Sequence, residues 1–127
     1  MSPFRMEKIE SASRSALELN KAFNRYDVNR MAELITDDCV FESHGPAPNG
    51  ATYKGKEATK GAWKELFDRS PDIKMEIEEM FGMGNRCILM WRSKGRDAEE
   101  KDIGVRGVDI YQVRSGLIFK IFSYVKG

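Results

Sequence analysis

The sequence contains few of the side chains that bind metals or form disulfides. It has one histidine, His44, and two cysteines, Cys39 and Cys87, which are not in a Cys-x-x-Cys spacing. Zinc sites usually recruit several His or Cys ligands, so we expect no metal site. Each cysteine lies in a predicted strand, where a buried thiol that acts as a small hydrophobic side chain is expected. A disulfide would need an oxidising compartment, and nothing in the sequence indicates one.

Long apolar runs and clusters of one charge sign are also missing. No stretch approaches the roughly 20 apolar residues of a transmembrane helix, and the N-terminal residues lack the apolar core of a secretory signal, so we expect a cytoplasmic protein. There are 21 Lys and Arg residues against 20 Asp and Glu, a formal net charge of +1, and no long basic run. This balance argues against nucleic acid and membranes as partners.

Length and composition are those of one globular domain. The chain has 127 residues, 41% of them hydrophobic and 32% charged, which are ordinary values for a protein with one core. Neither an internal repeat nor a long linker divides it. We therefore predict a single domain over residues 1–127, with the ordered fold beginning near Met6 and residues 1–5 outside it.

Three segments have the apolar spacing of a helix face. Residues 6–26 place apolar side chains three or four positions apart, which predicts one long amphipathic helix. Asp27 is a predicted N-cap of a short second helix, whose apolar side ends at Ile35. A third helix is predicted over residues 56–69 and ends before Pro71, because proline disfavours a helical residue before it.

The remaining segments are predicted to be strands. Asp37 and Asp38 are interpreted as a break that precedes the first strand. Strands or short extended pieces are expected over residues 39–44, 51–54, 73–81, 87–91, 103–113 and 117–125. Consecutive strands on short turns pair antiparallel. Helices segregated from an antiparallel sheet predict an α+β layer fold with the helices on one face.

Asp109 is an ionisable side chain inside an otherwise apolar strand. It shares a strand face with Val105, Tyr111 and Val113, and a buried carboxyl group needs a partner, a proton or a function. Burial would raise its pKa, and such a carboxylic acid could give or take a proton at a substrate carbonyl. The alternative is a structural aspartate paired with Arg92 on the neighbouring strand.

Several stretches resemble the nuclear transport factor 2-like superfamily. They are residues 32–42, Gly55-Lys-Glu-Ala at the start of the third helix, and residues 107–118. The loop at residues 46–50, the Trp91-Arg92 pair and the tail at residues 123–127 are most similar to the SnoaL-like branch. The resemblance extends over nearly the whole chain, from about Ile9 onward.

The resemblance implies a cone-shaped domain, the nuclear transport factor 2-like or cystatin-like roll. In it a strongly curved antiparallel sheet wraps around a long N-terminal helix, is joined by two further helices and encloses an apolar pocket. Relatives include ketosteroid isomerases, polyketide cyclases, scytalone dehydratase, limonene epoxide hydrolases and non-catalytic transport or scaffold domains. Many of them pair as dimers through the outer face of the sheet. Because the fold hosts many unrelated functions, it does not assign one.

The resemblance also suggests a role for Asp109. Ketosteroid isomerases keep a protonated aspartic acid at this strand position, where it donates a hydrogen bond to a developing oxyanion. SnoaL-like cyclases use an aspartate in this region as acid/base. The isomerase base and tyrosine, however, correspond to Ser43 and Leu19, and the last carboxylate of the epoxide hydrolases corresponds to Ser123. Scytalone dehydratase relies on histidines, of which this chain has only His44. Asp109 is thus a candidate acid without an identified base.

Further pocket residues are predicted from the faces of the strands and helices. Tyr111 shares the face of Asp109 and is the second catalytic candidate. The ligand-binding candidates are Trp91, Phe41, Ser43, Tyr26, Trp63 and Ser123. For the tryptophans and Tyr26, plain core packing is the alternative. Glu42 and His44 could form an acid/base pair, but strand alternation and the family register turn their face away from the cavity, so His44 is a minor candidate.

Two classes of function fit these observations. The first is a cofactor-free isomerase, cyclase or lyase that acts on a small hydrophobic, carbonyl-bearing molecule, with Asp109 as acid/base and Tyr111 as helper. The second is a binding or dimerisation module whose pocket holds a small hydrophobic molecule without converting it. Apolar residues expected on the outer face of the sheet predict a homodimer: Ile88, Met90, Ile118, Phe122 and Tyr124.

Overall fold

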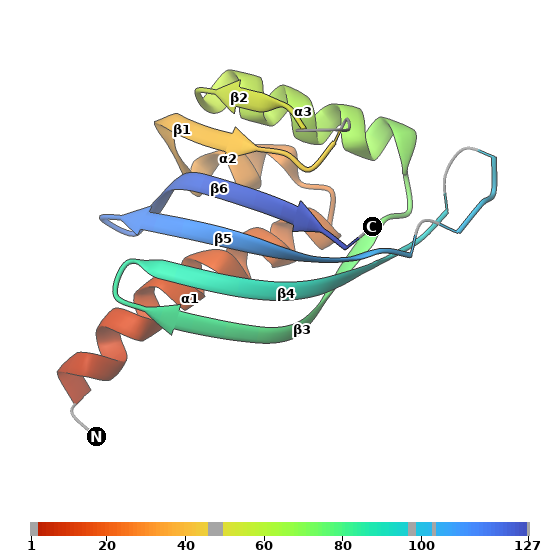
Figure 1. Cartoon of the computed structure of the whole chain (residues 1–127). Coiled ribbons are helices and arrows are strands. Elements are labelled where there is room, and N and C mark those ends of the chain that lie inside the picture. Colours follow the sequence, from red (N-terminus) through yellow and green to blue (C-terminus); the bar gives the residue numbers. More distant parts are fainter. Residues whose placement is uncertain (1–2, 46–49, 97–98, 103, 127) are drawn as a thin grey trace.

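The computed structural model describes residues 3–45, 50–96, 99–102 and 104–126, with side chains from Ala12 onward. Over these ranges it contains three helices and one six-stranded sheet (Figure 1). The helices are α1 (Pro3–Asn24), α2 (Val28–Glu33) and α3 (Lys56–Arg69). The strands are β1 (Ile35–Glu42), β2 (Thr52–Lys54), β3 (Lys74–Met83), β4 (Arg86–Lys94), β5 (Arg106–Arg114) and β6 (Leu117–Val125). Helix α1 includes residues 3–5, which were expected outside the fold, whereas residues 1–2 lie outside the described part.

The sheet has the strand order β2-β1-β6-β5-β4-β3. Strands β3 to β6 form the predicted antiparallel meander, and β2 pairs antiparallel with β1 at the other edge. Strand β1 joins the meander through a parallel pairing with β6, which local sequence patterns do not indicate. Both α1 and α3 lie on one side of the sheet (Figure 1). The predicted α+β class, with a curved sheet and three helices, is therefore confirmed.

The first strand begins earlier than predicted. Asp37 and Asp38 do not separate α2 from the first strand but lie within β1. The first residue of β1, Ile35, is fully buried and pairs with β6. Both aspartates are exposed and form ion pairs with Lys56 and Arg114. Charged residues are compatible with a strand where they face solvent, so the acidic pair carries no signal for a strand end here. Strand β1 then ends at Glu42, earlier than expected.

The core lies between α1 and the inner face of the sheet. Ala12, Ala16 and Ala22 are almost completely buried, and such small side chains allow the helix backbone to approach the strands closely. Asp27 caps α2 as predicted, because its side chain accepts a hydrogen bond from the Arg30 N–H at 3.0 Å. Helix α3 has the predicted bounds.

Strand alternation separates the two faces of the meander. On β4 the buried side chains are Cys87, Leu89, Trp91 and Ser93, whereas Ile88 is 40% exposed on the outer face. An apolar row crosses the outer face through direct cross-strand partners: Phe81, Ile88, Ile110 and Phe122. Ile118, expected on this outer face, is fully buried and pairs with buried Val113. A register shift next to that pair moves Ile118 to the inner side.

The predicted buried thiols are confirmed. Cys39 and Cys87 are free and have no exposed surface. Burial raises the pKa of the Cys39 thiol to about 12, which makes it a poor nucleophile at neutral pH. Among the described residues, no three His, Cys, Asp or Glu side chains gather as metal ligands would. None of the described helices combines the length and apolarity needed to cross a membrane.

Candidate functional site

A cavity of about 620 Å³ lies between the inner face of the sheet and the helices α1 and α3. Its walls are largely apolar, with Leu19, Phe23, Phe41, Trp63 and Ile121 among the lining side chains. The exposed lining residues are His44, Glu65, Arg69 and Val105, which lie at the ends of β1 and α3 and just before β5. These element ends lie on one side of the molecule (Figure 1). Because the exposed lining residues are there, we take this side as the mouth of the cavity.

Asp109 lines this cavity and is surrounded by uncharged hydrogen-bond donors. The side chain of Asp109 is 6% exposed. Its Oδ1 accepts a hydrogen bond from Trp91 Nε1 at 2.9 Å, and its Oδ2 accepts one from the Tyr111 hydroxyl at 3.0 Å. Ser123, its direct cross-strand partner on β6, lines the same cavity and helps to lower the pKa of the carboxyl group. The site thus joins one carboxyl group to three neighbouring side chains from β4, β5 and β6.

Gly107 allows the Trp91 ring to reach Asp109. Trp91 and Gly107 are direct cross-strand partners on β4 and β5. A Cβ atom at position 107 would overlap the six-membered ring of Trp91 and would lie 2.6 Å from the Tyr124 carbonyl oxygen. The missing side chain therefore leaves the space in which the indole lies across β5, with its N–H directed at the carboxyl group two residues further along.

Burial is the main influence on the ionisation of this group. Desolvation raises the pKa of the Asp109 carboxyl, and the hydrogen bonds from Ser123, Trp91 and Tyr111 only partly oppose that rise. Burial and the neighbouring carboxyl group likewise raise the pKa of the Tyr111 hydroxyl, so it keeps its proton and can donate. An indole N–H can only donate, so Oδ1 is an acceptor. The Tyr111 hydroxyl can rotate away from Oδ2, whereas the indole N–H is fixed on Oδ1, so Oδ2 is the oxygen that can more easily take a proton.

Arg92 is not the partner of Asp109, contrary to the structural alternative considered above. Its side chain is exposed on the outer face and lies 3.9 Å from a carboxylate oxygen of Glu78. Trp91 occupies the inner position next to it. Because successive residues of a strand point to opposite faces, the inner position of Trp91 excludes Arg92 from the cavity. The described residues give Asp109 hydrogen bonds to neutral side chains and no salt bridge.

His44 faces the cavity, contrary to the prediction that it points away. Its Nδ1 lies 3.3 Å from Ser123 Oγ, and its ring centre lies 6.4 Å from that of Trp91. Strand alternation misplaced it because β1 ends at Glu42, so the two-residue period does not apply to His44. Burial lowers the pKa of His44, with a further lowering from Arg69, while Asp109 acts in the opposite direction. Glu42 remains exposed.

The other predicted ligand-binding residues mostly line the cavity. Phe41, Ser43, Trp63, Trp91 and Ser123 do so, together with Tyr111. Tyr26 does not: its ring packs edge-on against Phe67 and lies under the ammonium group of Lys74. Tyr26 has a left-handed φ of 58° just beyond the end of α1, so the helical spacing that placed it in the core stripe no longer applies.

Further lining residues come from helices and strand ends and were not predicted from the sequence. They include Asn20, Met31, Leu66, Arg69, Met75, Ser93 and Val105. The helical spacing of Trp63 and Leu66 was a usable signal, because three residues along a helix lie on one face. Arg69 and Val105 are exposed and carry no such signal. Their place at the mouth depends on how the elements end.

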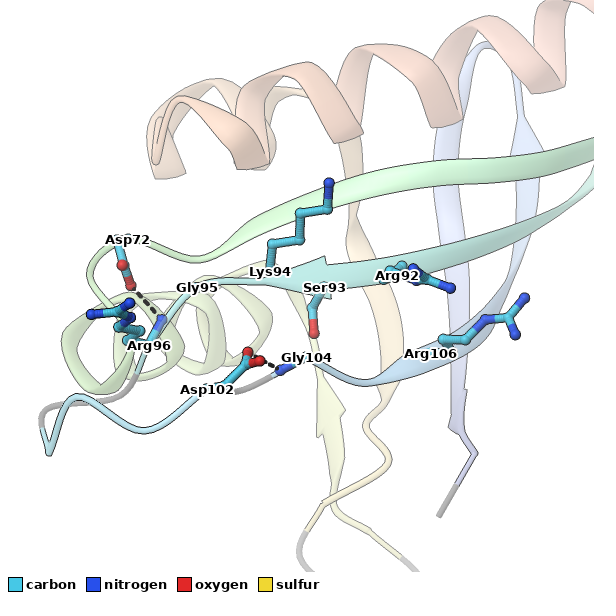
Figure 2. Close-up of a pocket in the computed structure, with 9 residues that line it drawn as sticks. All are labelled: Asp72, Arg92, Ser93, Lys94, Gly95, Arg96, Asp102, Gly104 and Arg106. Atoms are coloured by element: carbon cyan, nitrogen blue, oxygen red, sulfur yellow. Dashed lines mark hydrogen bonds between the residues drawn. The ribbon is translucent and has the colours of Figure 1, made fainter.

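A second hollow, of about 680 Å³, lies at the base of the β4–β5 connection (Figure 2). Each of its four cationic side chains is paired with a glutamate: Arg92 and Arg106 with Glu78, Lys94 with Glu76, and Arg96 with Glu100. Figure 2 shows that Lys94 points away from Arg92 and Arg106. These cationic groups are paired with glutamates and do not point toward a common position. The interior cavity is therefore the better candidate site.

Comparisons with known proteins agree with this geometry. Residues 16–121 match the family model of the SnoaL-like domain. An NTF2-like protein of unknown function from Mesorhizobium loti is 32% identical, with a TM-score of 0.80 and 94% of each chain covered. A search of the curated proteins found no match.

More distant solved structures share the fold alone. One is a candidate SnoaL-like polyketide cyclase from Jannaschia sp. CCS1, which is 14% identical with a TM-score of 0.82, covering 99% of this chain and 90% of that one. Another is a candidate ketosteroid isomerase from Kribbella flavida, also 14% identical, with a TM-score of 0.80 and coverage of 94% and 81%.

Proposed function

Because the chain belongs to the SnoaL-like family, we propose that it is a cofactor-free acid/base enzyme for a small hydrophobic molecule that carries a carbonyl group. The observation that carries the proposal is Asp109, a buried carboxyl group with a raised pKa on the wall of a cavity of about 620 Å³. Perturbed carboxyl groups in cavities are typical of catalytic acids and bases. Fold relatives described as a candidate polyketide cyclase and a candidate ketosteroid isomerase support the reaction class.

The proposed reaction is proton transfer at the carbon next to the carbonyl. Ionised Asp109 takes the proton on Oδ2, because the Tyr111 hydroxyl can rotate away from that oxygen while the Trp91 N–H stays fixed on Oδ1. The electron pair of the broken C–H bond forms the C=C bond of an enolate, and the carbonyl oxygen gains the negative charge. Tyr111 keeps its proton, and once Oδ2 is protonated its hydroxyl can rotate away from Oδ2 and donate a hydrogen bond to that oxygen. The protonated carboxyl then returns the proton to carbon.

The cavity walls suit a hydrophobic substrate body. Aromatic and aliphatic side chains dominate the lining, and its carboxyl and guanidinium groups are those of buried Asp109 and of exposed Glu65 and Arg69. A ligand that places its carbonyl at Asp109 would bury its apolar body against Phe23, Phe41 and Trp63. Each buried CH₂ group contributes roughly 0.8 kcal/mol to binding.

Hydrogen–deuterium exchange of 2-tetralone in D₂O tests this proposal, because exchange at the carbon next to the carbonyl requires enolisation. We expect the wild-type protein to accelerate the exchange, followed by proton NMR, above the rate in buffer. Asp109→Asn should lower the protein-catalysed rate about 10²- to 10⁴-fold, the usual contribution of a positioned acid or base.

Folding and binding controls separate catalysis from structure. The Asn side chain keeps an acceptor for Trp91 and cannot ionise, so Asp109→Asn should fold and bind 2-tetralone about as well as the wild type. A large loss of stability in urea denaturation would instead mark Asp109 as structural. Bound 2-tetralone without exchange would favour the binding module, and native mass spectrometry of the purified protein would then identify the molecule it retains.

We also propose that two copies of the chain pair through the outer face of the sheet. The supporting observation is the apolar row of Phe81, Ile88, Ile110 and Phe122, flanked by Tyr124, which is 61% exposed. Phe81 itself is 55% exposed. A contiguous exposed apolar row of this kind marks an interaction surface, and a second copy supplies a matching row in a two-fold dimer.

A further inference from the structure

We propose that Ser123 and His44 form a proton relay that connects the Asp109 carboxyl group with solvent at the mouth of the cavity. Asp109 is buried, Ser123 is half-buried and His44 is exposed, so the three residues lead outward in order. Ser123 lies directly opposite Asp109 in the β5–β6 pairing and lines the same cavity, and its Oγ lies 3.3 Å from His44 Nδ1. The relay rests on the proposed function and supplies the second base that the sequence left unidentified.

The Ser123 hydroxyl makes the two ends interdependent, because it has one proton and two possible acceptors. When Asp109 is ionised, that proton belongs in the bond to the carboxylate, and His44 Nδ1 must then donate to Ser123 Oγ. When Asp109 is protonated, its Oδ2–H can donate to Ser123, and Ser123 donates to a bare His44 Nδ1. Which ring nitrogen of neutral His44 carries the proton therefore depends on whether Asp109 is ionised: Nδ1 when it is ionised and Nε2 when it is protonated.

The transfer balances without any other reactant. After Asp109 has taken a proton from substrate, Oδ2 gives this proton to Ser123 Oγ while the original hydroxyl proton moves to His44 Nδ1. The imidazolium then releases its Nε2 proton to water at the mouth. The outward transfer leaves a carboxylate, a neutral imidazole with its proton on Nδ1, the enolate in the cavity and one proton in solvent. The reverse transfer takes a solvent proton through Nε2, Nδ1 and Ser123 to the carboxyl group, which gives it to the enolate carbon and so completes exchange with solvent.

The other charged and titratable groups around the cavity do not interrupt this path. Tyr111 holds Oδ2 from the side of β5, and Tyr53 lines the wall from β2. Helix α3 contributes Glu65 and Arg69 at the mouth, where Arg69 helps to keep the imidazole neutral. A neutral imidazole is the form that accepts a proton from Ser123.

Nitrogen NMR of the imidazole tests the relay directly, because His44 is the single histidine and needs no assignment. The pH is raised until the Asp109 carboxyl, followed by carbon NMR, is ionised and His44 is neutral. We expect the ring proton on Nδ1 in the wild type. We expect it on Nε2 in Asp109→Asn, whose side chain stays neutral, and in Ser123→Ala, which lacks the bridging hydroxyl. Ser123→Thr should restore the wild-type form.

Deuterium exchange of 2-tetralone gives the second readout. Removal of the relay in Ser123→Ala or His44→Gln should slow the label exchange roughly 100-fold, the lower end of the usual contribution of a positioned acid or base. Ring protons on the same nitrogen in the wild type and in Asp109→Asn would overturn the relay, as would unchanged exchange in Ser123→Ala. If the wild type catalyses no exchange, the proposed function fails, and the tautomer measurement alone still decides whether the three residues are coupled.

Discussion

At the scale of single residues, the site depends on Gly107, which has no side chain. Gly107 leaves space for the Trp91 ring, and that ring holds Oδ1 of Asp109. The contact is tight on two sides, since a Cβ atom would meet both the ring and the Tyr124 carbonyl. The geometry of the candidate site and the packing of the sheet thus both depend on this one position.

Gly107→Ala should therefore both destabilise the protein and weaken the hold on Asp109. We expect a loss of about 1–3 kcal/mol in the free energy of unfolding, the usual cost of overpacking. Urea denaturation measures this loss, and the near-ultraviolet circular dichroism of the tryptophans should change with it.

Gly61→Ala is the matched control. Gly61 is exposed within α3, and a Cβ atom there would have no neighbour within 4 Å. Because alanine favours the helix by roughly 0.5–1 kcal/mol over glycine, this variant should be slightly more stable than the wild type. Equal behaviour of the two variants would show that the space at Gly107 is not needed.

Individual residues differ in how far the sequence reveals their roles. Asp109 is detectable because a carboxyl group is costly in an apolar strand. Its hydrogen bonds to Trp91 and Tyr111 depend on which faces β4 and β5 turn to each other, and the absence of a Cβ at Gly107 decides the ring position. His44 was misplaced because the end of β1 is set by pairing with other strands and not by local alternation.

At the scale of elements, the Asn24 side chain links the end of α1 to the edge strand β3 by two hydrogen bonds. Asn24 Nδ2 donates to the Met75 carbonyl at 2.9 Å, and Asn24 Oδ1 accepts from the Met75 N–H at 2.7 Å. Strand β3 is an edge strand, so this amide satisfies backbone groups that no neighbouring strand can reach. Met75 also lines the cavity, which links this contact to the site.

Asn24→Ala should cost about 1–3 kcal/mol, because it leaves partly buried backbone groups without a partner. Amide hydrogen exchange should accelerate at Met75 more than in the centre of β5. Asn29→Ala, on the exposed side of α2, serves as the control and should change stability by less than about 0.5 kcal/mol. If both variants unfold at the same urea concentration, the Asn24 contact is not stabilising.

Most elements are predictable because their own residues specify them. Helix α3 has the predicted bounds because Gly55 precedes it and Pro71 follows it closely. The start of β1 is different: exposed acidic residues are uninformative in the sequence, and the strand is defined by its pairing with β6 at the far end of the chain.

At the scale of the whole molecule, the outer face of the sheet gives the test for the proposed dimer. Light scattering at micromolar concentration should give twice the mass of one chain for the wild type. Ile88→Lys places a charge in the middle of the apolar row and should yield monomers without unfolding, because the side chain already faces outward. Ala58→Lys, at an exposed position of α3, should remain dimeric. A monomeric wild type would contradict the proposal.

The position of β6 within the sheet has a consequence for synthesis of the chain. Strand β6 lies between β1 and β5, so the two groups of strands on either side stay separate until β6 joins them. A ribosome-bound chain that ends before residue 117 would therefore present unpaired edges on both β1 and β5. Such edges bind chaperones and other unfinished chains. Ser123 is also on β6 and lies opposite Asp109, so the last of these six strands in chain order both closes the sheet and brings the Ser123 side chain to the site.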